Sequence, residues 1–565
     1  MESVNEKSIK LSTAMKKILF IIPPFSAFEE YNPKNPTSRM PNLAAPYGIL
    51  SLISYINKGQ KKYDAQIIDC NQIILNNRQA LKNKKVFKKI IIENIRSKIT
   101  SYKPNYIGIS ALFSTNFSHL KYIVPAIKSF YPECVLIVGG GLATNMYTTL
   151  LEKMPGIDAL CYGEGEIPLI KLLKSKKKSD LSSISPAWIT KKSIKKHKLP
   201  QTEFINNLDE IPIIEFKHID FKKYNNRSPA LIDAFDSNKS SSSKIEMSIH
   251  TSRGCPFNCV FCSNGKIHGK KIRYMSTDLV KKTIKKYVSH YGMNVLLIED
   301  DNFLFNKDRV LEILKTIKDL NIKVEFPNGV AVNRIDDDIA QAFSETGVEV
   351  VPLAIESGSD YVLQQIIQKP FKKIQIFKAV KSLRKYNIRI HAFIVIGFPN
   401  EFDNHRKETF DMLLKLKLDW VYIFIAIPIP GSRLYEICDK HGYFLNKNYD
   451  NYNMTKCNIK APGVNPKKIE KEAYYMNIVT NFIVNKNYQD RKYSKCLPYF
   501  LHVAKKYPQH AAAHYMLANI YSKKNQKSLS GKHKNLYKNI INQDPFWSSI
   551  FQRLSKDQLI DSFQK

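Results

Sequence analysis

Short apolar runs alternate with amphipathic segments along the first 170 residues of the chain. Five of these runs have the length and composition of buried strands: residues 16–25, 63–70, 106–112, 134–141 and 159–166. Residues 45–58 and 117–132, between them, carry apolar positions at helical spacing. Such alternation is typical of a doubly wound parallel sheet of the Rossmann-like or flavodoxin-like kind. We therefore predict this α/β fold for residues 15–180, with its ligand site at the carboxyl ends of the strands.

A second alternating series begins near residue 245. Its six candidate strands are residues 244–250, 294–300, 323–329, 348–355, 388–397 and 419–427. Residues 276–291 and 308–320 between them have helical spacing. Six βα units in succession predict a partial (β/α)6 TIM-type barrel over residues 245–440, short of the eight units of the closed barrel.

The segment between the two series, residues 181–244, is mixed and polar, and we predict a connector. It contains a hairpin-like stretch at 187–205 and ends in a serine-rich loop at 236–244. Residues 1–14, before the first strand, are predicted to be a disordered tail.

From about residue 467 the strand pattern stops, and we predict a helical C-terminal region over residues 441–565. Some of its positions match tetratricopeptide repeats, namely Phe500, Pro508, Leu517, Ala518 and Tyr521, with Tyr537 and Pro545 repeating the interval of eight residues between Phe500 and Pro508. One or two degenerate repeats are one interpretation. A plain helical cap on the barrel is the other, because apolar stripes at helical spacing are usually core.

The length of 565 residues exceeds the roughly 250–300 that one hydrophobic core supports, so several domains are expected. The formal net charge of +37 comes mostly from scattered Lys, as a general composition bias would give, and does not favour nucleic-acid binding. No apolar run reaches the roughly 18 residues that cross a bilayer. The N-terminus lacks an apolar signal core, so we expect a cytoplasmic protein.

Nine cysteines in such a protein do not predict disulfides. Six of them are isolated, but Cys255, Cys259 and Cys262 lie within eight residues, directly after the first strand of the predicted barrel. A four-iron cluster held by three thiolates leaves one iron without a protein ligand. The alternative is a structural zinc site with His268 as the fourth ligand.

The stretch "TSRGCPFNCVFCSN", with Phe261 before the last cysteine, resembles the radical S-adenosylmethionine (SAM) superfamily and its cobalamin-associated branch. The resemblance implies a [4Fe-4S] cluster on the three cysteines, whose open iron binds SAM and whose electron cleaves it to a 5′-deoxyadenosyl radical. It also implies a flavodoxin-type or ferredoxin-type electron donor. Phe261 belongs to the same cofactor-binding segment.

Acidic residues follow the second strand of the barrel, where Glu299, Asp300 and Asp301 can accept hydrogen bonds from an ammonium group. By resemblance this segment contacts the amino group of SAM. The alternative is a solvated acidic turn that caps the next helix. Arg334 follows the third strand and can pair with the SAM carboxylate, or instead with Asp336 or Asp337 on the surface.

Two further segments at strand ends resemble the nucleoside site of the same family. Glu356 and Ser357 end the fourth strand and match the segment that holds the ribose hydroxyls. Gly397 and Pro399 end the fifth strand and match the adenine-binding segment, where a glycine allows close backbone approach.

The N-terminal part resembles the cobalamin-binding (B12-binding) domain that precedes many radical SAM barrels, on the stretches "PPFSAFEEYNP", "APYGILSLISYI", "IVGGGLATN" and "CYGEGEIPLIKLL". The resemblance runs from about residue 16 to 440. It implies that cobalamin is lined by Gly139, Gly140, Gly141 and Thr144. The Asp-x-His-x-x-Gly motif that supplies a cobalt ligand elsewhere is absent, as is usual in this branch, and Leu142 stands where relatives often have His.

Three functions follow from these patterns. The first is cobalamin-dependent radical methylation of an unactivated carbon in a small-molecule or carrier-bound substrate. The second keeps the radical chemistry but performs cyclisation, rearrangement or oxidation without methyl transfer. The third is a non-catalytic adaptor with a structural metal site and helical repeats. The sequence does not identify the substrate.

Overall fold

The structure is a computed structural model that describes residues 15–31, 43–59, 63–175, 180–197, 199–224 and 244–560. The predicted tail at residues 1–14 lies outside the described residues, as does nearly all of the serine-rich loop at 236–244. The chain forms two compact units. The first comprises Met1–Pro41, Pro46–Ile205 and Glu210–Phe221, and the second comprises Asn42–Ala45, Asn206–Asp209 and Lys222–Lys565.

The first unit is built on a six-stranded sheet with the order β2-β1-β3-β4-β5-β6. The strands are β1 (Lys16–Ile22), β2 (Tyr63–Asp69), β3 (Tyr106–Ser110), β4 (Val135–Gly139), β5 (Ala159–Cys161) and β6 (Trp188–Ile189). The pairs among β1 to β5 are parallel, and Ile18 of β1 stands opposite Ala65 on one side and Tyr106 on the other. This order is that of flavodoxin-like folds and creates a switch point between β1 and β3. The predicted doubly wound sheet is confirmed.

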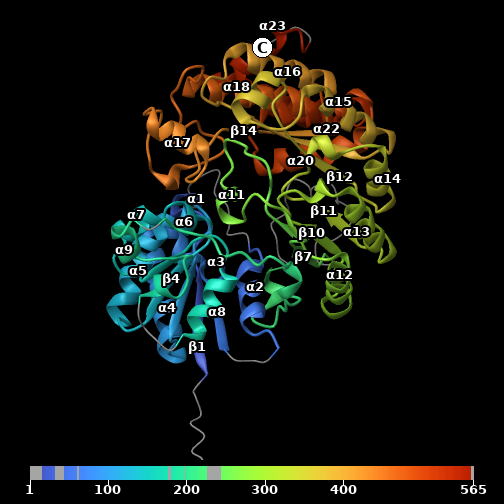
Figure 1. Cartoon of the computed structure of the whole chain (residues 1–565). Coiled ribbons are helices and arrows are strands. Elements are labelled where there is room, and N and C mark those ends of the chain that lie inside the picture. The colour runs from blue at the N-terminus through green and yellow to red at the C-terminus, as the bar shows by residue number, and fades with distance from the viewer. Residues whose placement is uncertain are drawn as a thin grey trace, which may run out of the picture. The chain divides into compact units, whose positions relative to one another are not determined.

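Helices cover both faces of this sheet, because its central strands are apolar on both sides. Every residue of β1 from Ile18 to Ile22 is buried. On one face Ile53 and Leu169 pack in the same core as Phe20. Figure 1 shows helices on either side of the blue and cyan strands of this sheet. The helices are α1 (Phe28–Tyr31), α2 (Tyr47–Ile56), α3 (Cys70–Asn76), α4 (Lys84–Tyr102), α5 (Asn116–Phe130), α6 (Gly141–Asn145), α7 (Tyr147–Lys153), α8 (Glu166–Lys174) and α9 (Lys191–Lys195). The short helix α10 (Phe221–Tyr224) begins at the last residue of the first unit and continues into the second.

The hairpin-like stretch predicted at residues 187–205 has a different structure. Only Trp188–Ile189 is a strand, and it pairs antiparallel with β5, so this part of the predicted connector extends the first sheet. Thr190 and Ser193 then form a capping box that ends the strand and begins α9. The hairpin prediction is wrong because this local capping favours a helix where a second strand was expected.

The second unit contains six parallel strands that follow one another in chain order. They are β7 (Glu246–Ile249), β10 (Val295–Ile298), β11 (Lys323–Glu325), β12 (Val350–Glu356), β13 (Arg389–Ile396) and β14 (Trp420–Ile425). The first three pair together and so do the last three, and a parallel bridge between Val330 and Leu353 joins the two sets. No pairing of β7 with β14 closes the sheet within the described residues. The partial six-unit barrel is therefore confirmed.

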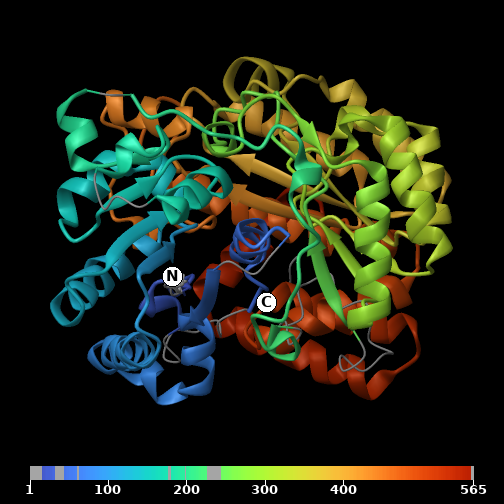
Figure 2. The same ribbon diagram turned by 60° about the horizontal axis from the view of Figure 1, so that its bottom comes forward.

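The helices between these strands lie on one side of the sheet, as the green and yellow ribbons of Figure 2 show. Each is amphipathic; α12, for example, buries Val280, Ile284 and Tyr287. They are α12 (Thr277–Tyr291), α13 (Lys307–Asp319), α14 (Asp337–Glu345), α15 (Lys373–Lys385) and α16 (Asp403–Leu416). Two further helices stand apart from this row: α11 (Asn264–Ile267) lies in the segment after β7, and α17 (Arg433–Lys440) follows β14.

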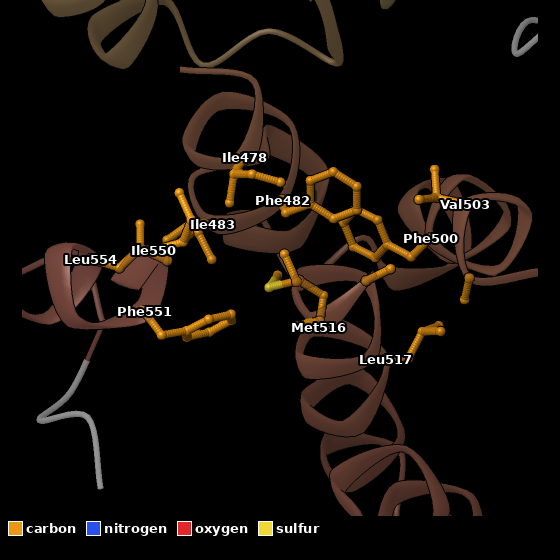
Figure 3. Packing of buried hydrophobic residues seen from close by; sticks show 14 of the residues in the cluster. Ile478, Phe482, Ile483, Phe500, Val503, Met516, Leu517, Ile550, Phe551 and Leu554 are labelled. Carbon is orange, nitrogen blue, oxygen red and sulfur yellow. The ribbon is translucent and has the colours of Figure 1, made fainter. Parts of the chain in front are cut away.

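The C-terminal helices share one hydrophobic core with the last strand of the barrel. They are α18 (Pro466–Ile478), α19 (Lys486–Gln489), α20 (Tyr493–Lys506), α21 (Ala511–Lys523), α22 (Lys527–Gln543) and α23 (Pro545–Lys556). Figure 3 shows Phe482, Phe500 and Leu517 in this core, where the rings of Phe482 and Phe500 stack with centroids 5.2 Å apart. Trp420 of β14 belongs to the same core and stacks on Tyr499 at 5.0 Å. The helices thus cap the barrel, while the tetratricopeptide-like positions Phe500 and Leu517 contribute to the cap.

The outer edge of β14 is covered by side-chain amides. Asn481 accepts a hydrogen bond from the backbone N–H of Val421 and donates one to its carbonyl, both at 2.7 Å. Asn485 donates to the carbonyl of Asp419 at 3.1 Å. These bonds occupy backbone groups that a further strand would otherwise pair. Among the described helices, none has the length and apolar composition needed to cross a membrane.

Candidate active site

The three clustered cysteines lie on an excursion from the barrel whose base is a short antiparallel ladder. Strand β8 (Ser252–Arg253) pairs with β9 (Arg273–Tyr274) and closes the loop that runs from residue 254 to residue 272. Gly254 begins it with φ +94°, and a Cβ there would collide with the carbonyl oxygen of Lys271. Only glycine fits this position. The loop follows β7 at the carboxyl end of the strand, as predicted.

The thiols of this loop differ from the other cysteines of the chain. All nine are free; Cys255 and Cys259 are half-buried and Cys262 is exposed, whereas the other six are buried. Burial raises the pKa of Cys259 to about 12, and the neighbouring Lys369 opposes the rise. A thiol with so high a pKa becomes a thiolate when a metal coordinates it. Three free, accessible thiols on one loop are the donor set that a three-thiolate iron–sulfur cluster requires.

The zinc alternative requires ligands that converge on one ion. In the part of the chain that the structure describes, no three His, Cys, Asp or Glu side chains, the three clustered cysteines included, lie close enough together to hold a single metal ion. His268 instead ends the short helix α11 on the cysteine loop, and its carbonyl accepts a hydrogen bond from Arg273 at 2.9 Å.

Asp300 is buried and anchors the base of the cysteine loop. Its carboxylate accepts hydrogen bonds from the N–H of Thr251 at 2.5 Å, from the Thr251 hydroxyl at 2.6 Å and from the Ser252 hydroxyl at 2.6 Å. Arg309 of α13 donates to the carbonyls of Thr251 at 2.8 Å and Met275 at 3.1 Å. Burial raises the pKa of Asp300, and the hydrogen bonds to its carboxylate oppose that rise. These contacts give Asp300 a supporting role beneath the cysteine loop, and its contact with SAM stays a prediction.

The acidic residues on either side of Asp300 are more accessible. Glu299 accepts a hydrogen bond from the Ser248 hydroxyl at 2.8 Å, and its other oxygen lies 3.6 Å from Nε2 of His250. Asp301 accepts one from Asn264 on the cysteine loop at 2.6 Å. Both keep lone pairs for an ammonium group.

The alternative role for this acidic segment was a cap for the following helix. Helix α13 is capped instead by Asn306, whose side chain accepts from the N–H of Arg309 at 3.1 Å. The acidic residues are therefore not needed as caps.

Arg334 is exposed, with its guanidinium 4.6 Å from the ring centroid of Phe305. The predicted surface pairs do not form, because Asp336 binds Lys307 at 2.6 Å and Asp337 binds Lys385 at 2.7 Å. The five N–H groups of Arg334 therefore remain available for a carboxylate.

Glu356 ends β12 in a strained conformation beside the cysteine loop. Its φ is +66°, and the ladder between β12 and β13 is irregular at this point. Its carboxylate pairs at 2.9 Å with Lys369, whose ammonium also donates to the carbonyl of Ala354 at 2.9 Å. Strain of this kind is found where a backbone is shaped for a ligand. Lys369 is a residue of this site that sequence reasoning missed.

Ser357 is fully buried, and its hydroxyl is used within the protein. It lies 3.0 Å from the hydroxyl of Thr409 and accepts from the N–H of Ser359 at 3.2 Å. The Ser357 hydroxyl already has hydrogen-bond partners within the protein, so its contact with ribose stays a prediction. The carboxylate of Glu356 is suited to accept hydrogen bonds from the ribose hydroxyls.

The loop after β13 is ordered by a buried carboxylate that sequence reasoning missed. Glu401 accepts from the N–H groups of Gly397 at 2.5 Å and Phe398 at 3.1 Å. Gly397 has φ +91°, but a Cβ there would meet Ile469 of α18 at 3.1 Å, so the close approach that requires glycine is to this helix. Pro399 is buried in the same loop.

Phe261 connects this loop with the cysteines. Its ring lies 6.1 Å from that of Phe398, so the aromatic residue before Cys262 packs toward the predicted adenine segment. The sequence segments predicted for SAM thus meet at the carboxyl end of the partial barrel.

Several buried polar atoms at this end have no hydrogen-bond partner within the described residues. Among them are both amide atoms of Asn302, Oδ1 of Asn333, Oγ of Ser359 and Oε1 of Glu401, which follow β10, β11, β12 and β13 in turn. A buried polar group without a partner costs about 1–3 kcal/mol. Groups of this kind at successive strand ends fit a bound polar cofactor.

The glycine segment predicted for cobalamin lies at the carboxyl edge of the first sheet. Gly140 has φ +102°, and a Cβ there would lie 2.6 Å from the carbonyl oxygen of Ala111. Gly139 is less constrained, since a Cβ would meet Cys161 at an ordinary 3.7 Å. Gly141 begins α6. The glycine at 140 is required by the backbone itself.

Thr144 holds two loops of this edge together. Its hydroxyl donates to the carbonyl of Gly140 at 3.2 Å and accepts from the N–H of Gly163 at 3.1 Å. The side chain is buried, and its contact with cobalamin stays a prediction.

An apolar surface that sequence reasoning missed lies at the switch point of the first sheet. Leu112 and Phe113 follow β3 and are 51% and 50% exposed. The ring of Phe113 packs edge-on against Phe25, which follows β1, with centroids 5.6 Å apart. Exposed apolar side chains at a switch point fit a large, flat ligand.

Comparison with protein families matches residues 249–413 to the Radical SAM superfamily and residues 40–173 to the B12 binding domain. The chain therefore contains a radical SAM domain and a B12-binding domain, and it is an enzyme and not the non-catalytic adaptor of the third interpretation. Its cofactors are the [4Fe-4S] cluster, SAM and cobalamin.

Individual relatives support the same class. The chain is similar to an uncharacterized methyltransferase of Pyrococcus horikoshii, at 28% identity over 80% of this chain and 90% of the relative. It is also similar to the cytidylyl-2-hydroxyethylphosphonate methyltransferase of Streptomyces wedmorensis, at 26% identity over 66% of this chain and 74% of the relative.

Among solved structures, the cobalamin-dependent radical enzyme OxsB shares the fold with a TM-score of 0.59 and 14% identity, over 96% of this chain and 80% of that one. The methyltransferase TsrM from Kitasatospora setae has a TM-score of 0.57 and 13% identity, over 76% of this chain and 79% of that one.

Proposed function

We propose that this protein is a cobalamin-dependent radical SAM methyltransferase that acts on an unactivated carbon of a small-molecule or carrier-bound substrate. The observation that carries the proposal is that one chain has two sheets whose strand carboxyl ends are each suited to bind a ligand. One bears three free thiols beside unpartnered polar atoms, and the other bears the constrained Gly140 beside an exposed apolar surface. Relatives named as methyltransferases support methyl transfer.

When bound, the cluster, SAM and cobalamin together supply radical formation and a transferable methyl group. The chain's own residues bind and orient these groups. In this proposal Cys255, Cys259 and Cys262 hold the cluster. Glu299 and Asp301 accept hydrogen bonds from the SAM ammonium group.

The remaining SAM contacts divide along the same strand ends. Arg334 binds the carboxylate as a bidentate donor. Glu356 accepts from the ribose hydroxyls, with Lys369 fixing its carboxylate. The backbone from Gly397 to Pro399, ordered by Glu401, faces the adenine. This scheme requires no side-chain base or nucleophile.

Cobalamin in this proposal lies at the edge of the first sheet, with Gly139, Gly140 and Gly141 on its nucleotide tail. Leu112 and Phe113 offer it apolar contact. No side chain is assigned to cobalt, because the motif that would supply a histidine is absent.

A flavodoxin-type or ferredoxin-type protein is the proposed electron donor. The net charge of +37 favours association with such an acidic partner. Nine free cysteines fit a reducing compartment, so we propose a cytoplasmic location.

The test is anaerobic preparation with iron, sulfide and cobalamin, followed by spectra with and without SAM. We expect a retained corrinoid and a reduced-cluster electron paramagnetic resonance (EPR) signal that changes when SAM is added. With substrate, methylated product should form together with S-adenosylhomocysteine and 5′-deoxyadenosine. A cluster signal indifferent to SAM would overturn the proposal.

Radical chemistry without methyl transfer is the second candidate. It is favoured by similarity to the anaerobic magnesium-protoporphyrin IX monomethyl ester cyclase of Rubrivivax gelatinosus, at 23% identity over 71% of this chain and 70% of the relative. Turnover that yields 5′-deoxyadenosine but no S-adenosylhomocysteine would favour it.

A further inference from the structure

Asn302 is a buried amide whose hydrogen-bonding capacity is unused. It lies in the loop after β10 and is 6% exposed. Neither its Nδ2 nor its Oδ1 has a hydrogen-bond partner within the described residues. A buried amide in this state is rare in a native protein, because it gives up hydrogen bonds to water without replacing them.

Asn302 stands at a helix N-terminus but does not cap that helix with its side chain. It is the N-cap residue of the 3-10 helix Phe303–Phe305, yet its side chain makes no capping bond. Asparagine is among the best residues for this role. Asn306, four positions later, does cap its helix. The side chain of Asn302 therefore serves some other partner.

The loop that carries Asn302 is fixed against the cysteine loop by contacts of the residues before and after Asn302. Asp300 binds Thr251 and Ser252, and Asp301 binds Asn264 at 2.6 Å. Beyond Asn302, the ring of Phe305 packs against Phe257 with centroids 6.4 Å apart. The position of the amide relative to the cysteines is thus fixed by contacts on either side of it.

The neighbour of the amide is the Cys255 thiol. The residues on either side of Asn302 contact Asn264 and Phe257 of the loop that carries Cys255, and the Asn302 side chain is close enough to act on that thiol. An N–H group beside a thiolate stabilises the negative charge on sulfur, which is the form that binds iron.

We propose that Asn302 is a positioning residue of the cluster site, whose side-chain N–H donates a hydrogen bond to sulfur on the Cys255 side of the bound cluster. Hydrogen bonds to the sulfurs of an iron–sulfur cluster are among the factors that set its reduction potential. They favour the reduced state, because reduction adds negative charge to the sulfurs. The inference rests on the proposed cluster but not on methyl transfer.

The test compares Asn302→Leu with Asn306→Leu in the full-length chain. Leucine is close to asparagine in size and cannot donate. The cluster midpoint potential of each protein is measured by anaerobic EPR-monitored redox titration without SAM. Thermal unfolding of each protein without cluster supplies a readout that is independent of activity.

We expect the two variants to behave in opposite ways. Asn302→Leu should bind the cluster with a midpoint shifted to lower potential, and its cluster-free form should unfold at the wild-type temperature or above. Asn306→Leu should keep the wild-type potential and unfold at a lower temperature, because it loses a cap.

Two results would overturn the inference. One is a wild-type potential in Asn302→Leu. The other is a fall in its cluster-free unfolding temperature as large as that of Asn306→Leu, which would make Asn302 an ordinary cap. Failure of the proposed function has a different signature, since wild-type protein would then bind a cluster that does not respond to SAM.

Discussion

The two strand edges of this protein prepare their ligand sites by different means. In the first unit the edge is shaped by backbone: Gly140 is in a conformation that only glycine adopts readily, and Thr144 ties two loops through main-chain groups. In the second unit the edge is shaped by buried side chains, above all Asp300 and Arg309 beneath the cysteine loop. A site for a large organic ligand can be built from close backbone approach. A site for a cluster needs ligands held at fixed positions.

The comparison predicts that cluster binding and corrinoid binding can be lost independently of each other. The largest effect is expected from Cys259→Ala, which removes one of three thiolates. Cluster-derived absorption and the SAM-dependent EPR change should be lost, whereas the corrinoid spectrum should persist. Cys134→Ala is the control, because that thiol is buried in the first unit at the amino end of β4, away from the glycine segment. Loss of the corrinoid in Cys259→Ala would mean that the edges are not independent.

The next largest effect is expected from Asp300→Ala. It leaves the hydroxyls of Thr251 and Ser252 without their acceptor, and we expect a loss of about 3 kcal/mol in the free energy of unfolding. Iron content after reconstitution should fall with it. Asp301→Ala removes a single hydrogen bond, from Asn264, and should cost about 1 kcal/mol. Equal losses in urea unfolding would contradict the anchoring role of Asp300.

A pH effect should separate the second unit from the first. Burial raises the pKa of Glu401 from its usual 4.5 to about 7. Between these values the unfolded chain releases a proton that the folded chain keeps, so folded-state stability falls as pH rises through this window. Glu401→Gln removes this dependence and should be more stable than wild type above pH 7, by roughly 2–3 kcal/mol. The measurement is urea unfolding of wild type and Glu401→Gln at several pH values. If the free energy of unfolding of both proteins changed with pH in the same way, the assignment to Glu401 would be wrong.

The smallest effect is expected at the glycine edge. Gly140→Ala forces a side chain into positive φ and against Ala111, at a cost of about 2 kcal/mol, with reduced corrinoid affinity. Gly139→Ala meets only an ordinary contact and should change either quantity little. If Gly140→Ala and Gly139→Ala bound corrinoid with the same affinity, the conclusion that backbone conformation shapes this edge would be wrong.

The contrast also explains what could be predicted from the sequence. The strands of both units were predictable because their signals are local in the sequence: short apolar runs mark the strands, and apolar positions at helical spacing mark the segments between them. The cysteine loop was predictable because three thiols at that spacing serve few purposes. The predicted hairpin at 187–205 failed because a two-residue strand followed by a capping box has almost no hydrophobic signature.

The roles of neighbouring site residues could not be predicted in this way. Glu299, Asp300 and Asp301 are three carboxylates in a row, and only the folded loop determines that the middle one is buried beneath the cysteines. Lys369 and Glu401 were missed because their partners, Glu356 and the N–H of Gly397, become neighbours through loop geometry. Leu112 was predicted to be the last residue of a strand and Phe113 was assigned to no element, and the exposure of both depends on where the sheet stops.

The amide of Asn481 has a practical consequence for anyone who wishes to isolate the radical SAM half of this enzyme. It satisfies both backbone groups of Val421 on the open side of β14, in the way that a neighbouring strand would. A chain trimmed after α17 would uncover that row of donors and acceptors together with the indole of Trp420. Such a fragment would be prone to join other copies edge to edge, so expression clones should retain the helices that follow.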